Sequence, residues 1–196
     1  MTSLGGHRRF LLLGVVVAAM LAAIAGCGES DEDAATSAAE EALTSTDPSS
    51  CTDLQTENYR RQIQLSMGDF AIEACQQELV LTAADSAEVT SIKVDGDTAT
   101  VDVSHTGAAF DGQVISYEMV KEDGQWKLDL LAGFAEFDKA TFARALDRLL
   151  VEAKDINPPG AECGNNQLKA LSVEELEQLY TSGDFREYAK VYEPCS

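Results

Sequence analysis

The sequence predicts an α+β protein in which helices pack on one face of a curved antiparallel sheet. Residues 89–131 contain two pairs of β-prone runs, and an Asp-Gly dipeptide separates the runs of each pair. Asp-Gly at such a position is the strongest short-range signal for a β-hairpin, because a type I′ turn needs positive φ at both central residues. Segments with helical spacing of apolar residues precede and follow this stretch, which makes the sheet the centre of the fold.

The first hairpin is expected to turn at Asp95-Gly96 as a two-residue loop. This loop would place Val94 opposite Asp97 and Ile92 opposite Ala99, with the apolar side chains on one face. Side chains alternate between the two faces of a strand, so a slip by one residue would scatter them. The apolar pattern therefore predicts an antiparallel sheet with one buried face.

The second hairpin is expected to turn at Asp123-Gly124 and to present a larger apolar face. In that register Met119 lies opposite Leu128, and Glu118 lies opposite Asp129 as an unfavourable pair of like charges. Such an apolar face must be covered, and any space left beneath the cover is a candidate pocket. The expected pocket lining is Tyr59, Ile115, Tyr117, Met119, Trp126, Leu128 and Leu130.

Three helices are expected before the sheet. Residues 34–43 form an alanine-rich helix, a second helix starts near Ser50 and ends at Gly68, and a third covers residues 70–81. The apolar stripe of the second helix makes it the nearest candidate to cover the sheet face.

The region after the sheet is expected to be a small helical appendage. Asp138 caps its first helix, Ser172-Val-Glu-Glu175 is a capping-box pattern that opens the next one, and Asp184 starts the last. A region of this size has a thin hydrophobic core, so a disulfide would contribute much to its stability.

The N-terminus carries the pattern of an exported lipoprotein. The basic segment His7-Arg8-Arg9 precedes an apolar run over residues 10–23, which is short for a spanning helix of about 20 residues. Ile24-Ala25-Gly26-Cys27 then matches the bacterial lipobox, in which small residues precede the cysteine that becomes lipidated. Cys27 is therefore expected to anchor the chain on the outer face of the bacterial cytoplasmic membrane. The alternative is an ordinary signal peptide or an uncleaved anchor.

The mature chain is strongly acidic. Removal of residues 1–26 removes two arginines and no acid, so the net charge changes from −20 to about −22. Phosphates of nucleic acids and of anionic lipid head groups are repelled by such a surface. We therefore expect no nucleic-acid partner. Solubility is the simplest role of the charge, and recruitment of a cationic partner is the alternative.

Four cysteines remain besides Cys27, and they allow three connectivities. Proximity along the chain favours Cys51–Cys75 and Cys163–Cys195. No CxxC or Cys/His zinc spacing occurs, so disulfides in an oxidising compartment are expected rather than a metal site. The expected organisation is a signal peptide over residues 1–26, a lipidated tether over 27–33, an α+β domain over 34–136 and a disulfide-clasped helical region over 137–196.

Four short motifs carry a resemblance to a known family. They are Leu43-Thr44 with Asp47-Pro48, Cys51-Thr52-Asp53-Leu54, the run from Val94 to Val101 and the run from Val120 to Leu128. With these motifs, residues 34–134 resemble the NTF2-like superfamily, in particular its small bacterial lipoprotein branch. The resemblance implies a cone in which N-terminal helices pack on a curved antiparallel sheet. The motifs belong to turns and core, so they imply a fold rather than a function.

No catalytic machinery is recognisable in the mature sequence. His105 is the only histidine that remains, and its position at a strand end beside Thr106-Gly107 predicts a solvated side chain. The enzyme class that the resemblance invites, a ketosteroid-isomerase-like or cyclase-like one, needs a carboxylate base and a tyrosine in one cavity. The predicted register places Tyr117 and Asp129 on opposite faces, so we expect no enzyme and no cofactor.

The expected function is that of a lipid-anchored, extracytoplasmic binding or interaction module. The alternatives are a carrier of a small apolar ligand in the sheet cavity and, less favoured, the enzyme. The expected partners are the membrane, through the lipid anchor, and a protein or a small apolar ligand. The interior distinguishes these functions: an open cavity with a lone carboxylate favours the enzyme, an open cavity without one favours the carrier, and a filled interior favours the interaction module.

Overall fold

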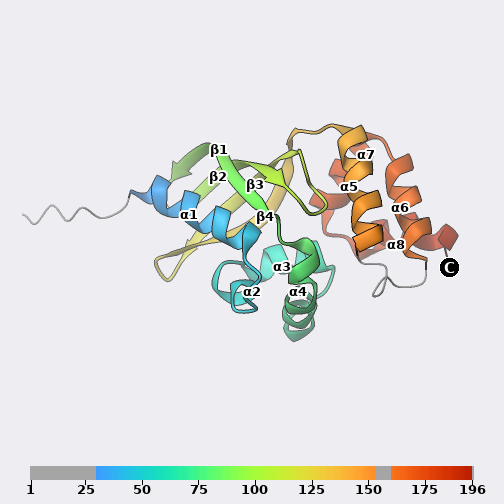
Figure 1. Cartoon of the computed structure of the whole chain (residues 1–196). Helices are drawn as coiled ribbons and strands as arrows, with labels where there is room; N and C mark the ends of the chain where they lie inside the picture. Colours follow the sequence, from blue (N-terminus) through green and yellow to red (C-terminus); the bar gives the residue numbers. More distant parts are fainter. Residues whose placement is uncertain (1–29, 153–159, 196) are drawn as a thin grey trace, which may run out of the picture.

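The computed structural model describes residues 30–152 and 160–195, in which one antiparallel sheet is combined with helices on either side of it in the chain. The anchor prediction at Cys27 lies outside the described residues. Each strand pairs with its neighbour in the chain, and the sheet curves around α1 while the later helices gather beyond its far end (Figure 1). The strands are β1 (Ser86–Asp95), β2 (Thr98–Thr106), β3 (Val114–Glu122) and β4 (Gln125–Glu136).

The first hairpin turns one residue later than the sequence suggests. Asp95 pairs with Thr98, so the loop consists of Gly96 and Asp97 rather than Asp95-Gly96. Gly96 has a φ of 62° at the first loop position, which is where a type II′ turn requires glycine. From Ser91 to Val94, each β1 residue therefore lies opposite a residue two positions later than predicted. The apolar face is unchanged, because side chains alternate with a period of two.

The second hairpin turns at Asp123-Gly124, as predicted. Both residues have positive φ, which is the requirement of a type I′ turn. Glu122 pairs with Gln125, and Met119 pairs with Leu128 in the predicted register.

A β-bulge at Asp129 changes the register beyond that point. Glu118 pairs with Leu130 instead of Asp129, so the predicted pair of like charges does not form. The Asp129 carboxylate instead accepts a hydrogen bond from the Thr56 hydroxyl at 2.7 Å. The extra residue also reverses which side chains face inward, so Leu131 is buried in the core and Leu130 is not.

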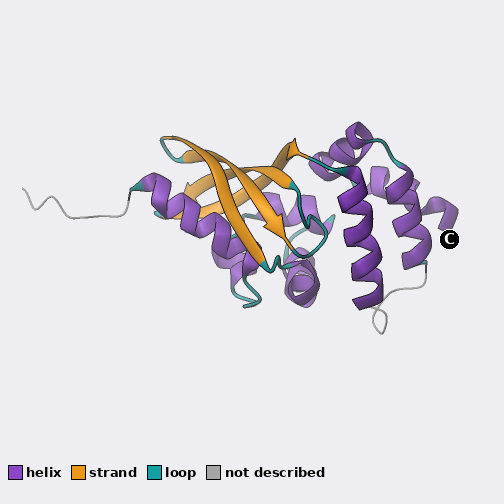
Figure 2. Cartoon of the chain, turned by 45° about the horizontal axis from the view of Figure 1, so that its top comes forward, coloured by secondary structure: helices purple, strands orange, loops and turns teal. Residues whose placement is uncertain are grey.

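Helix α1 (Asp31–Thr44) covers the apolar face of the sheet (Figure 2). Its buried residues are Ala35, Ala39 and Ala42, which lie one helical turn apart. Their small side chains let the helix backbone approach the sheet closely, and for this reason α1 rather than the second helix is the main cover. The sheet residues buried with it are Ala99, Val101, Val103, Ile115, Tyr117, Met119, Trp126, Leu128 and Leu131.

The expected second helix is divided into α2 (Ser50–Asp53) and α3 (Glu57–Gln64). Between them the chain runs beside β4. The Thr56 N–H donates to the Leu128 carbonyl, and the Leu128 N–H donates to the Leu54 carbonyl. These bonds give the β4 edge a partner and interrupt the helix. The Thr56 side chain then caps α3.

Helix α4 (Asp69–Thr82) follows closely the prediction for residues 70–81. Cys75 and Leu79 are buried, whereas Phe70 and Val80 are exposed to solvent. The helix therefore packs against the rest of the protein only through the side that carries Cys75 and Leu79.

The C-terminal region forms a helical cluster around its own buried core. Its capping box at Ser172 and Glu175 and the cap at Asp184 form as predicted. No helix among the described residues is long and apolar enough to span a membrane. The elements are α5 (Lys139–Glu152), α6 (Ala161–Ala170), α7 (Val173–Ser182), α8 (Phe185–Tyr192) and a 3₁₀ turn, η1 (Glu193–Cys195). Helix α6 has no counterpart among the helices expected from the sequence, because its polar Gly-Asn-Asn centre lacks a long apolar stripe.

The helical cluster is bound to the sheet by a buried glutamine. The side-chain amide of Gln62 donates to the carbonyls of Leu131 and Thr181, and its oxygen accepts from the Leu131 N–H at 2.7 Å. The Glu177 carboxylate in addition accepts from the Phe134 N–H. These bonds use backbone groups that the bulged end of β4 leaves unpaired, so the region is continuous with the α+β domain.

Candidate ligand cavity

A cavity of about 340 Å³ lies where the α+β domain meets the helical cluster. This volume falls at the lower end of the range of small-molecule pockets, about 300–1,000 Å³. Its walls come from the end of α1, from α3 and α4, from the β2–β3 loop and from α5 to α8. The lining includes Leu43, Gln55, Tyr59, Ile63, Cys75, Leu79, Leu81, His105, Phe110, Tyr117, Leu146, Leu149, Leu150, Asn165, Tyr180 and Tyr188.

His105 lies in this cavity wall and is not the solvated histidine that its place in the sequence suggests. Only 5% of its surface is exposed, and its ring packs edge-on against Phe110. The Nε2 atom lies 3.0 Å from the Tyr117 hydroxyl. Burial lowers the pKa of His105 to about 4, because a charged imidazolium would lose its hydration. The ring is therefore neutral at neutral pH.

Two tyrosines from different elements meet beside His105. Tyr117 comes from β3 and Tyr59 from α3, and their ring centroids are 6.3 Å apart. Burial raises the pKa of both phenols, so both hydroxyls keep their protons. This end of the cavity presents hydroxyl, imidazole and amide groups, all without charge.

The β2–β3 loop places Phe110 between the two hydrophobic cores. Gln113 is fully buried, and its side chain bonds to backbone groups of Asp111 and Asp138. The Gly107 N–H and the Arg148 guanidinium both bond to the Asp111 carboxylate and lower its pKa. The loop is thereby fixed to α5, and Phe110 closes the space between sheet and cluster.

Most of the predicted lining residues are packed core instead. Only Tyr59 and Tyr117 border the cavity. The other inward-facing side chains fill the space between sheet and α1, and Leu130 leaves the inner face because of the bulge. The predicted residues outside the cavity are Ile115, Met119, Trp126, Leu128 and Leu130.

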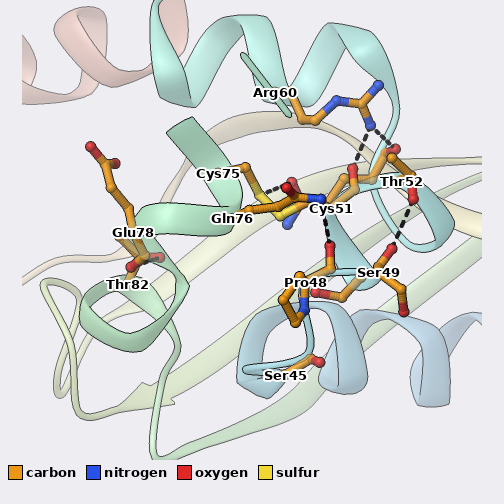
Figure 3. Close-up of a disulfide and its surroundings, with 12 residues drawn as sticks. Ser45, Pro48, Ser49, Cys51, Thr52, Arg60, Cys75, Gln76, Glu78 and Thr82 are labelled. Carbon is orange, nitrogen blue, oxygen red and sulfur yellow. Dashed lines mark hydrogen bonds between the residues drawn. A yellow bond between two sulfur atoms is a disulfide. The ribbon is translucent and has the colours of Figure 1, made fainter. Parts of the chain in front are cut away.

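A disulfide supports the cavity from the side of α4 (Figure 3). Cys51 and Cys75 are joined with a Cα–Cα distance of 6.1 Å, and Cys75 is part of the lining. The Arg60 guanidinium donates to the carbonyls of Cys51 and Gln55, which ties α3 to the turn that carries the disulfide. This arrangement holds the loop before α3 in place.

The second disulfide joins Cys163 to Cys195, and both pairs are those that proximity along the chain favours. The pair connects α6 to the 3₁₀ turn at the C-terminal end. Because Ala161 and Asn165 of α6 border the cavity, this crosslink stabilises the wall opposite α4.

The described part of the lining contains no charged side chain. None of the residues of 30–152 and 160–195 that border the cavity is Asp, Glu, Lys or Arg. Among residues 30–152 and 160–195, no group of three or more His, Cys, Asp and Glu side chains is arranged to hold a metal ion. The site is suited to binding an uncharged molecule rather than to metal or anion chemistry.

The burial of His105 could have been predicted from the alternation of residues along β2. Ala99, Val101, Val103 and His105 alternate along β2, and this period places the histidine on the buried face with the others. Phe110 and Tyr180 had no such signal, because their neighbours come from segments far apart in the chain.

Comparisons with family models, curated proteins and solved structures found no match to this chain.

Proposed function

We propose that this protein is a lipid-anchored, extracytoplasmic binding module that carries a small apolar molecule in the cavity between its sheet and its helical cluster. The observation that carries this proposal is a cavity of about 340 Å³ whose lining, among the described residues, is mostly apolar and contains no charged side chain. Apolar pockets with a few convergent polar groups are the usual form of a ligand site.

The anchor and the location rest on the N-terminal sequence. Ile24-Ala25-Gly26-Cys27 after an apolar run supports lipidation of Cys27 and export to the outer face of the cytoplasmic membrane. The two disulfides are consistent with an oxidising compartment. The strongly acidic composition speaks against a nucleic-acid partner.

We also propose that residues 34–136 belong to the NTF2-like superfamily. Support comes from the order of elements, in which helices precede a curved four-stranded antiparallel sheet that packs on α1. Fold alone would not assign a function in this case, so the cavity and not the resemblance carries the functional argument.

The cavity favours the carrier over the other two functions. A module that acts only through its surface has no need of an open apolar interior. An enzyme of the ketosteroid-isomerase type needs a carboxylate base in the cavity, and no Asp or Glu in the described part of the chain borders it. His105 is a poor substitute, because general bases work best with a pKa near the ambient pH and burial lowers its pKa to about 4.

Occupancy of the cavity tests the proposed function. The full chain is purified in lipid nanodiscs, and bound molecules are extracted into organic solvent and identified by mass spectrometry. Ala109→Trp places an indole in the cavity lining, and Ala135→Trp adds the same group at an exposed position of β4. A molecule retained by the wild type and by Ala135→Trp, but depleted in Ala109→Trp, supports the carrier. Identical extracts from all three proteins would contradict it.

A further inference from the structure

We propose that Tyr59 and Gln55, together with the His105–Tyr117 pair, form a polar subsite at one end of the cavity. This subsite selects an uncharged, hydrocarbon-rich ligand that carries one hydrogen-bonding carbonyl or hydroxyl group. The inference rests on the proposed carrier function and adds the chemical class of the ligand.

Two polar side chains in the cavity wall lack hydrogen-bond partners. Tyr59 and Gln55 are each more than nine-tenths buried and both border the cavity. Among the described residues, no group bonds to the Tyr59 hydroxyl or accepts from the Gln55 side-chain amide. The fully enclosed side-chain atoms without a partner in this part of the chain are instead Arg60 Nε and Trp126 Nε1, so the Tyr59 hydroxyl and the Gln55 amide remain accessible from the cavity that they border. The Gln55 side-chain oxygen lies 3.4 Å from the Cys75 sulfur, but a disulfide sulfur has no hydrogen to donate. Polar groups that converge on an apolar cavity without partners in the protein are free to bond to a ligand group.

The neighbouring His105–Tyr117 pair limits the charge of that ligand group. The imidazole is neutral and its Nε2 already faces the Tyr117 hydroxyl, so the pair offers no net charge. Within residues 30–152 and 160–195, no lysine or arginine borders the cavity to balance an anion, and no carboxylate borders it to balance a cation. A charged head group brought here would lose its hydration without a counter-ion. A carbonyl or hydroxyl needs only the hydrogen bonds that Tyr59 and Gln55 can supply.

The rest of the cavity is suited to hydrocarbon. Leu146, Leu149 and Leu150 of α5 and Leu79 and Leu81 of α4 supply aliphatic walls. Tyr180 and Tyr188 also border this region, where their rings pack edge to face with centroids 6.1 Å apart. The polar subsite therefore fixes one end of the ligand while the aliphatic walls accept its chain.

Three photoreactive probes of equal length test this selectivity. Each has a nine-carbon chain with a mid-chain diazirine, and they differ only in ending as a methyl ketone, a carboxylate or a methyl group. The full chain in nanodiscs is titrated with each probe and irradiated. Labelled peptides are then quantified by mass spectrometry, with the peptides of α4 and α5 that carry the aliphatic walls as the readout.

The ketone should reach half-saturation of the cavity peptides at a concentration at least tenfold below that of the carboxylate. Tyr59→Phe keeps the ring and removes the hydroxyl. It should therefore raise the concentration at which the ketone half-saturates the cavity peptides roughly tenfold, and it should leave that concentration unchanged for the methyl probe. Tyr192→Phe is the matched control, because Tyr192 lies outside the cavity lining, and it should change the half-saturation concentration of the ketone by less than about twofold. If no probe labels the cavity, the carrier function itself fails. If the carboxylate binds as well as the ketone, or Tyr59→Phe has no effect on the ketone, the polar subsite is refuted while the carrier stands.

Discussion

Acidification should destabilise this protein through His105. The ring is buried and neutral in the folded state, where its pKa is lowered from 6.5 to about 4. Unfolding returns the ring to water and to its ordinary pKa. Between pH 6.5 and 4 the unfolded chain therefore binds more protons than the folded one. Stability is fully present above this window and is lost as the pH falls through it.

The size of the effect follows from the pKa difference. Each pKa unit corresponds to about 1.4 kcal/mol, so a lowering from 6.5 to about 4 predicts a loss of about 3 kcal/mol. Such a loss is a large part of the 5–15 kcal/mol that typically separates folded from unfolded domains. Below pH 4 the contribution of this ring is constant, because both states are then protonated.

Urea unfolding of the full chain between pH 4 and 7.5 measures this linkage. Other groups also titrate in the range, so the comparison is with His105→Gln, which keeps a neutral polar side chain and removes the titration. The free energy of unfolding of the wild type should fall by about 3 kcal/mol more than that of the variant across the window. Parallel pH profiles for the two proteins would refute the assignment of a buried, neutral His105.

Four further measurements address other parts of the structure. Gln62→Leu leaves the backbone groups of β4 and α7 without partners, so urea unfolding should give a loss of about 2–4 kcal/mol. The exposed Gln178→Leu should change stability by less than about 0.5 kcal/mol. Trp126→Ala should cost about 3–5 kcal/mol, because the indole is only 3% exposed, and wild-type tryptophan emission should resist quenchers. Cys27→Ala should abolish incorporation of labelled fatty acid and release the protein from membranes, whereas an acylated or membrane-bound variant would contradict the anchor. Non-reducing peptide mapping should recover the two disulfides described above, and crossed pairs or free thiols would contradict them.

The sheet could be anticipated from sequence because its signals are local. The Asp123-Gly124 turn requires positive φ at adjacent residues, and alternation of apolar residues fixes which face is buried. The helix caps at Ser172 and Asp184 are local for the same reason, since the capping side chain bonds to an N–H two or three residues away.

The bulge at Asp129 could not be predicted in the same way. It adds a residue whose side chain bonds to another element, since the Asp129 carboxylate accepts from the Thr56 hydroxyl. The alternation of apolar and polar residues looks the same before and after a bulge. It does not show at which residue the inward-facing positions shift by one. For this reason Leu131, and not Leu130, is buried.

The cavity could not be predicted from the sequence, because its lining residues lie far apart in the chain. Its walls join residues as distant as Leu43 and Tyr188, and no short pattern encodes a space between elements. The burial of His105 follows from the same assembly, because Phe110 covers the ring from the loop that follows it.

With Cys27 lipidated as proposed, the position of α1 would set the distance between the membrane and the cavity. The helix begins at Asp31, four residues after Cys27, and its other end borders the cavity through Ala42 and Leu43. Fourteen helical residues span about 21 Å, more than twice the screening length of about 8 Å at physiological salt. Of the three carboxylates in the first turn of α1, Asp31 pairs with Lys121, whereas Glu32 and Asp33 would be repelled by an anionic bilayer. With Cys27 lipidated as proposed, an upright α1 would thus act as a rigid post that holds the cavity about 21 Å beyond the anchored end.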